Sequence, residues 1–282
     1  MDLDSWIPLM RSPGGAHALR RDGEGLVDET GARYAVEGDV LRMTGSDSPV
    51  GDDAKWNRFY EWFAPLYDAN ERWLGRAFSG LDVVAARREI VENLGIDQGS
   101  SLLEVCTGPG VYQPLLAQAV GPNGRLAALD LSFAMLRRCG QRTRAQAPTP
   151  LLVQANGASL PFGDGVFDAI FRGGQRVKGL SVLRAVTQAY VGGIKLFTDP
   201  DRSLQECARV LRKGGRLFLG DEGFAPSIPA RDWRRRILPR MNPGFLREPP
   251  AIPAGLALRK QDWVYGGLMF LWTLERVPSP AA

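Results

Sequence analysis

Short apolar runs separated by longer amphipathic stretches dominate residues 101–222. The short runs are typical of strands that are buried on both faces, whereas apolar residues recurring every three or four positions predict helices. The pattern predicts strands at 101–106, 125–131, 150–156, 167–171 and 216–222, and helices at 112–121, 132–146 and 199–215. Regular alternation of strands and helices predicts an α/β fold with a doubly wound parallel sheet.

Two further parts precede this region. Residues 1–45 are expected to form a small N-terminal β unit, in which short strands are separated by turns at Gly31 and Gly38. Residues 46–98 are expected to form a linker and a helical lid. Aromatic residues recur there at helical spacing, and Pro65 divides the helical stretch.

Residues 99–282 form the predicted core. Three signals mark helix ends: Ser132 is a candidate N-cap, Gly95 closes a helix over 81–95, and Asp199 or Asp201 lies at the start of another. The apolar stretches at 256–260 and 267–277 are expected to pair as terminal strands.

Composition narrows the function classes. The chain has 282 residues, 44% of them apolar, and a net charge of +4, which is ordinary for a soluble globular protein. The arginine-rich run at 231–240 is interpreted as a solvated helix, so no nucleic-acid partner is expected. No apolar stretch approaches the roughly 20 residues that span a bilayer. Without a signal-peptide pattern at the N-terminus, the expected location is the cytoplasm.

Cysteine and histidine are sparse and scattered. The three cysteines, Cys106, Cys139 and Cys207, have neither metal-ligand nor disulfide spacing. The single histidine, His17, lies in the N-terminal unit and not in the predicted core at 99–282. No protein-built metal site is therefore expected.

The segment LLEVCTGPG, residues 102–110, ends a predicted strand with a glycine-rich turn. In doubly wound sheets, ligands bind at the carboxyl ends of strands where the strand order reverses, and glycines let the backbone approach them. Asp130 ends the next strand, where a carboxylate can accept hydrogen bonds from a ribose diol. Asn156 ends the third strand, where an amide can pair with an adenine edge.

Four segments in this order resemble the motifs of class I S-adenosylmethionine-dependent methyltransferases of the menaquinone and ubiquinone type. They are LLEVCTGPG, LAALDLS, ANGASLPFGDGVFDAIF and ECARVLRKGGRLFL, and the resemblance extends over residues 55–277. The family implies a Rossmann-like sheet of seven strands with an antiparallel last strand. It also implies S-adenosylmethionine as the methyl donor. A nicotinamide-binding turn would need a third glycine, where this chain has Gln113.

The resemblance also implies which residues bind the donor. Glu104, Thr107, Gly108 and Gly110 would hold its methionine part, and Asp130 its ribose. The residues beside the adenine would be Leu131, Met135, Asn156 and Gly157. The family usually has aspartate where this chain has Asn156, which keeps the hydrogen-bonding shape and loses the charge. Cys106 falls inside the motif's strand, so we interpret it as a packed residue.

The acceptor is expected to be a small hydrophobic or aromatic metabolite, since aromatic residues crowd the predicted lid. Tyr60 and Tyr67 are the candidate catalytic residues, for the case in which the acceptor must lose a proton. Core or lid packing is an equally good interpretation of both. The chain is expected to act as a monomer or a homodimer.

Two features depart from the family pattern. Residues 172–190 look inserted, and they either cap the acceptor pocket, close it, or form a surface excursion. The N-terminal unit resembles the zinc-ribbon-like units that precede some methyltransferases, without their cysteine ligands. Three alternatives remain open: a donor-binding scaffold for a non-methylating reaction such as a cyclisation, an RNA methyltransferase, and a binding protein with an inactive site.

Overall fold

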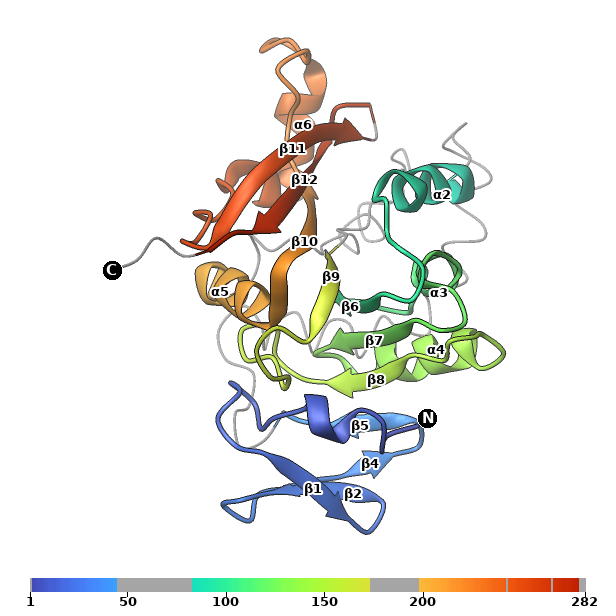
Figure 1. The fold of residues 1–282 in the computed structure, drawn as a ribbon. Coiled ribbons are helices and arrows are strands. Elements are labelled where there is room, and N and C mark those ends of the chain that lie inside the picture. Colours follow the sequence, from blue (N-terminus) through green and yellow to red (C-terminus); the bar gives the residue numbers. More distant parts are fainter. Residues whose placement is uncertain (1, 45–82, 173–197, 242, 265, 279–282) are drawn as a thin grey trace.

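The structure is a computed structural model that describes residues 2–44, 83–172, 198–241, 243–264 and 266–278. Its main sheet contains β4 (Val36–Glu37), β5 (Val40–Arg42), β6 (Ser101–Val105), β7 (Arg125–Asp130), β8 (Leu151–Gln154), β9 (Phe167–Arg172), β10 (Leu211–Glu222), β11 (Leu256–Val264) and β12 (Met269–Arg276). These nine strands lie in the order β11-β12-β10-β9-β6-β7-β8-β5-β4 (Figure 1).

The strand directions confirm the predicted fold class. Neighbouring strands from β5 through β8, β7, β6 and β9 to β10 are parallel. The last strand, β12, runs antiparallel between β10 and β11, so that β11 and β12 are the expected terminal pair. The chain passes from β6 outward through β7 to β8 and then returns to β9 on the other side of β6. The strand order therefore reverses at β6.

Helices cover both faces of this sheet. They are α2 (Val83–Asn93), α3 (Gln113–Val120), α4 (Phe133–Thr143), α5 (Pro200–Val210) and α6 (Trp233–Met241), with 3-10 turns η1 (Ile7–Leu9) and η3 (Pro243–Leu246). Because side chains alternate along a strand, Leu103 and Val105 pack with α5 while Leu102 packs with α2 and α3. Glu104 is therefore on the same face as Leu102.

Local signals placed the starts of α4 and α5 correctly, but α4 ends at Thr143, three residues before the predicted end. The Ser132 hydroxyl accepts the Met135 N–H at 3.3 Å, and Asp199 caps α5 in the same way. The helix expected over 199–215 is too long, because it ends at Val210. Residues 212–215 instead form an irregularity inside β10, where the register against β9 shifts.

The N-terminal residues build two sheets. β1 (Leu19–Asp22), β2 (Gly25–Asp28) and β3 (Arg33–Tyr34) form an antiparallel sheet of three strands, and β5 extends the main sheet by pairing with β8. The turns expected at Gly31 and Gly38 are present, and both glycines have positive φ angles, 89° and 63°. Trp6 packs its ring against Phe162 and Phe167 of the core. The division at residue 45 stays a prediction.

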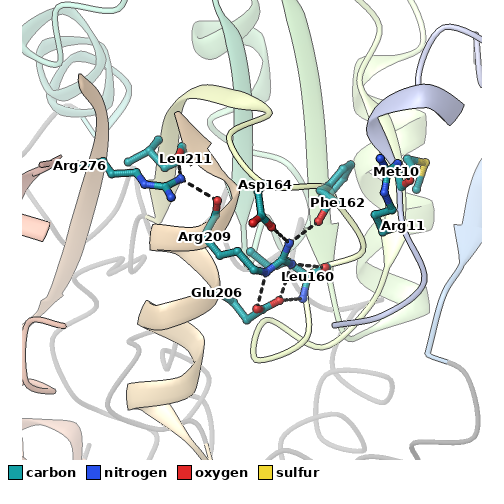
Figure 2. Close-up of polar contacts among 9 residues, drawn as sticks. All are labelled: Met10, Arg11, Leu160, Phe162, Asp164, Glu206, Arg209, Leu211 and Arg276. Carbon is teal, nitrogen blue, oxygen red and sulfur yellow. Dashed lines mark hydrogen bonds and ion pairs between the residues drawn. The ribbon is translucent and has the colours of Figure 1, made fainter. Parts of the chain in front are cut away.

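An arginine on α5 binds the loop that follows β8 (Figure 2). Arg209 donates to the carbonyls of Phe162 at 2.7 Å and Leu160 at 3.0 Å. The same guanidinium contacts both carboxylate oxygens of Glu206, at 2.7 and 2.8 Å, and Asp164 at 2.9 Å. Two of the quoted motifs, LPFGDGVFD and ECARVLRKGG, are thus joined by one side chain.

Candidate functional site

Asp130 holds the loop between β6 and α3 against the end of β7. One of its carboxylate oxygens accepts the Gly108 N–H at 2.8 Å, and the other accepts the Ser132 N–H at 2.9 Å. The Thr107 N–H donates to the carbonyl of Leu129 at 3.1 Å. The loop is therefore fixed at the carboxyl edge of β6 and β7, beside the point of strand reversal where such sheets bind ligands.

The two glycines of this loop serve different purposes. Gly108 has a φ of +54°, and a Cβ added there would meet no atom of the described residues within 4 Å. Gly110 has a φ of +73°, and a Cβ there would overlap the Cys139 side chain on α4. Within the described part of the chain, Gly108 therefore faces open space, whereas Gly110 lets α4 approach the loop closely.

Cys106 lies in the loop, because β6 ends at Val105. The expectation that it sits inside the strand is wrong. Its φ of +61° is in the left-handed region, which non-glycine residues seldom adopt. The half-buried side chain packs against the main core, and its sulfur lies 3.8 Å from an Arg172 nitrogen.

Glu104 and Gln113 form a buried polar pair beneath the loop. The Thr107 hydroxyl donates to Glu104 at 2.6 Å, and the Gln113 amide donates to the same oxygen at 2.5 Å. Burial raises the pKa of Glu104 to about 7, although these two hydrogen bonds act to lower it. The Gln113 Oε1 atom is buried and has no hydrogen-bond partner among the described residues. A cationic amino group would satisfy both the carboxylate and this oxygen.

The sequence pattern does not identify Gln113 as a site residue. It shows only that Gln113 occupies the position of the third glycine in a nicotinamide-binding turn. Nothing in the local pattern pairs it with Glu104, which is nine positions earlier in the chain. The pairing arises because α3 begins directly above the end of β6.

The loop after β8 carries Asn156 and Gly157. The Asn156 Oδ1 accepts the Ala158 N–H at 2.9 Å, so the side chain shapes its own turn. The Gly157 carbonyl accepts the Ser203 hydroxyl at 2.7 Å, and that hydroxyl oxygen accepts an Arg172 N–H at 2.6 Å. Arg172 is fully buried at the end of β9. The one signal for it in the sequence is an arginine ending the apolar strand FDAIFR.

The remaining donor-site candidates differ in exposure. Leu131 is half-buried, and its carbonyl accepts the Gln154 side-chain amide at 3.0 Å. Met135 is buried in the apolar cluster that includes α2 and α3. The structure thus gathers Glu104, Thr107, Gly108, Gly110, Asp130, Leu131, Met135, Asn156 and Gly157 on the loops and helix starts at the carboxyl edge of β6, β7 and β8.

Two acidic side chains end β10 at this same edge. Asp221 and Glu222 are 0% and 5% exposed, and Asp221 accepts the Glu222 N–H at 2.7 Å. They are buried because the antiparallel strand β12 pairs with β10 as far as Glu222.

The candidate catalytic residues Tyr60 and Tyr67 lie outside the described residues, as does the insertion at 172–190 beyond Arg172. Within the described ranges, no cluster of three or more His, Cys, Asp or Glu side chains could hold a metal ion. No helix in those same ranges is both long and apolar enough to cross a membrane.

The comparison with protein families supplies the deciding observation. Residues 102–215, which contain the glycine loop and Asp130, match the methyltransferase domain family. Over these residues the chain is similar to methyltransferase domains, in agreement with the order of its motifs. The matched region comprises the strands from β6 to the start of β10, together with α3, α4 and α5.

Two relatives extend the match beyond the methyltransferase domain. The "2-phytyl-1,4-naphtoquinone methyltransferase" of Trichormus variabilis is 30% identical over 164 residues, which cover 57% of this chain and 62% of that protein. The "demethylmenaquinone methyltransferase" of Listeria monocytogenes is 27% identical over 184 residues, 65% of this chain and 67% of that protein. The chain thus spans less than two thirds of the Trichormus relative.

Solved structures share the fold of the methyltransferase domain. The crystal structure of the [4+2]-cyclase SpnF superposes with a TM-score of 0.56, covering 83% of this chain and 98% of SpnF. The sequences are 15% identical. Similarity at this level shows a shared fold, and fold alone does not establish a reaction.

Proposed function

We propose that this chain transfers the methyl group of S-adenosylmethionine to an O, N or C atom of a small hydrophobic acceptor of the quinone type. The observation that carries the proposal is the glycine loop, which Asp130 holds at the point of strand reversal above the buried Glu104–Gln113 pair. The names of the relatives from Trichormus and Listeria support a quinone-type acceptor.

The residues at the loop fit the donor. Glu104 and the Gln113 Oε1 atom are placed to accept hydrogen bonds from its amino group. The open space at Gly108 admits a ligand against the backbone. Asp130 can accept ribose hydroxyls as well as backbone N–H groups, because each carboxylate oxygen has two lone pairs. We propose that the half-buried Leu131 and the turn at Asn156 contact the adenine.

The chemistry asks little of the protein beyond positioning. The sulfonium of the donor supplies an activated methyl group, so that a nucleophile held in line at near-attack distance suffices. A general base is needed only if the acceptor must first lose a proton. Tyr60 and Tyr67 remain our proposal for that role.

Calorimetric titration with S-adenosylmethionine and S-adenosylhomocysteine tests the donor site. We expect both to bind in the micromolar range, which corresponds to about 8 kcal/mol. The acceptor class is then tested by mixing protein, S-adenosylmethionine and a reduced prenylated naphthoquinone, and by measuring S-adenosylhomocysteine formation. Absence of binding by either cofactor would refute the site. Consumption of an acceptor without S-adenosylhomocysteine would replace methyl transfer with a non-methylating reaction.

A further inference from the structure

Exposed apolar side chains gather around α6. Of the large apolar side chains that the described part of the chain leaves exposed, three lie within residues 233–246. They are Trp233, Ile237 and Leu246, which are 58%, 46% and 71% exposed. Scattered exposed apolar residues are normal on a protein surface, but a group of them indicates an interaction site.

The exposed face of α6 is both apolar and basic. Trp233, Arg236, Ile237 and Arg240 recur at spacings of three and four residues, so they share one face of the helix. All four side chains are exposed. This face therefore offers two apolar side chains flanked by two guanidinium groups.

The opposite face of α6 anchors the helix to the protein. Leu238 packs against the apolar cluster formed by Ala225, Ile228 and Leu268. The Arg235 guanidinium lies 4.7 Å from the centre of the Phe224 ring. These contacts hold the helix in place and leave its other face outward.

The charge of this segment exceeds the net charge of the whole chain. Residues 231–247 contain six arginines and one aspartate, whereas the entire protein carries +4. The aspartate, Asp232, is already paired with Arg234 at 2.7 Å. Within the described ranges, Arg231, Arg236 and Arg240 form no ion pair. The segment is thus a concentrated patch of positive charge.

The patch lies at the functional edge of the sheet, meaning the edge where the parallel strands have their carboxyl ends. α6 follows the carboxyl end of β10, and the chain between them is fastened by the Ala225 N–H, which donates to the Gly267 carbonyl at 2.7 Å. The parallel strands β6, β9 and β10 end at the same edge, which also carries the Gly108 loop. In Figure 1, α6 lies at the opposite end of the molecule from β1 and β2.

We propose that this patch, the α6 surface, docks on an anionic lipid bilayer through Arg231, Trp233, Arg236, Ile237, Arg240 and Leu246. Helices that lie in a membrane interface insert apolar side chains below the headgroups and keep basic groups at the phosphates. Tryptophan is enriched at that depth. Docking would bring the functional edge of the sheet to the lipid, which suits a hydrophobic acceptor; this last clause rests on the proposed function, whereas docking itself does not.

A nucleic acid is the other polyanion that such a charge could bind. Its phosphates call for basic and polar groups, and exposed aliphatic side chains such as Ile237 and Leu246 contribute nothing to phosphate contacts. An anionic bilayer can contact both the basic and the apolar side chains of this surface. The apolar side chains therefore favour the lipid.

Sedimentation with vesicles tests the proposal on the full chain. Vesicles of phosphatidylcholine with phosphatidylglycerol should bind the protein, and pure phosphatidylcholine vesicles should bind it far more weakly. The triple variant Arg231→Gln, Arg236→Gln, Arg240→Gln should lose about a hundredfold in affinity, since each basic group near an anionic surface contributes roughly fivefold. The double variant Trp233→Ala, Ile237→Ala should lose about tenfold or more without any change in charge.

A matched control separates the α6 surface from total charge. The variant Arg20→Gln, Arg144→Gln, Lys213→Gln removes three exposed positive charges elsewhere and should bind vesicles nearly as the parent does. Near-ultraviolet circular dichroism of each variant confirms that it is folded, and no step needs methyl transfer. Equal losses in the control and α6 triple variants would overturn the proposal. So would unchanged binding of the Trp233→Ala, Ile237→Ala variant, or tight binding of a 30-base-pair duplex with no binding of anionic vesicles.

Discussion

Two loops at the same edge of the sheet are held in opposite ways. The loop at 106–112, after β6, is fixed by Asp130, which reaches its backbone from the neighbouring strand. The segment at 160–164, in the loop after β8, is fixed by Arg209 and Glu206, which reach it from α5. One loop is thus held by an acidic side chain at its rim, and the other by an ion pair beneath it.

The difference indicates which loop is built for a ligand. Among the described residues, the Gln113 Oε1 atom at the first loop has no hydrogen-bond partner, and no atom lies within 4 Å of a Cβ added at Gly108. In the second loop, the carbonyls of Leu160 and Phe162 are already bonded to Arg209. A loop whose polar groups all have hydrogen-bond partners stabilises the fold. A loop beside an unpaired hydrogen-bond acceptor can bind another molecule.

The largest predicted effect is the loss of stability when Arg209, which holds the loop after β8, is removed. Arg209→Ala leaves Glu206 without its ion-pair partner and two loop carbonyls without their donor. We therefore expect a loss of about 3–5 kcal/mol in the free energy of unfolding. Chemical denaturation measures this loss. The control Arg212→Ala removes an exposed ion pair with Asp168 and should cost under about 1 kcal/mol. Equal losses in the two variants would contradict the structural role of Arg209.

Removal of Asp130 should lower the affinity for the methyl donor. Asp130→Ala should weaken S-adenosylmethionine binding by about 2–4 kcal/mol, because charge-assisted hydrogen bonds are lost and the Gly108 loop is released. Isothermal titration measures this change, and Arg209→Ala variants that remain folded should bind almost normally. An unchanged donor affinity in Asp130→Ala would remove this residue from the site.

The buried Glu104 should make stability depend on pH. Burial raises its pKa to about 7 in the folded protein, above the ordinary value of 4.5, so folding favours the protonated form. The contribution of Glu104 is therefore complete below pH 4.5 and is lost as the pH rises to 7, by about 3 kcal/mol. Glu104→Gln keeps the shape without the charge. Urea midpoints of this variant should thus change less between pH 4.5 and 7 than those of the parent, and parallel profiles would refute the assignment.

The smallest expected differences in stability are those between alanine substitutions at Gly108 and Gly110. Alanine at either position meets a left-handed backbone, which costs roughly 1–2 kcal/mol. Gly110→Ala should cost about 1 kcal/mol more, since its methyl group also overlaps Cys139. Gly108→Ala should lower donor affinity more than stability, and Gly108→Val should abolish binding in a folded protein. Thermal melting paired with donor titration distinguishes these effects, and a normal titration for Gly108→Val would place the donor elsewhere.

Local patterns predicted much of this fold. The alternating strands from β6 to β10, the cap at Ser132 and the turns at Gly31 and Gly38 all follow from short-range rules about apolar spacing, hydrogen-bonding side chains and positive φ angles. The same rules misjudged the end of α5. A helical pattern continues past Val210, but pairing of Leu211 with Phe167 of β9 draws the chain into the sheet.

Local sequence patterns predicted only part of the candidate site. Motif order pointed to Gly108 and Asp130, and the structure places them 2.8 Å apart between N–H and carboxylate. The Glu104–Gln113 pair and the buried Arg172–Ser203 contact were not foreseen. Their residues carry no motif, and each pairing depends on two elements that meet only in the folded chain.

The sequence by itself determined the order of the elements and the residue types at the carboxyl ends of the strands, because both are set by neighbours a few positions away. Tertiary structure alone decided that β5 would join β8, more than a hundred residues later, and that a glutamate with a raised pKa would lie under the glycine loop. The reason is physical. Hydrophobic spacing acts over one turn of helix or one pair of strand residues, whereas burial and its electrostatic consequences depend on which distant surfaces close over a side chain.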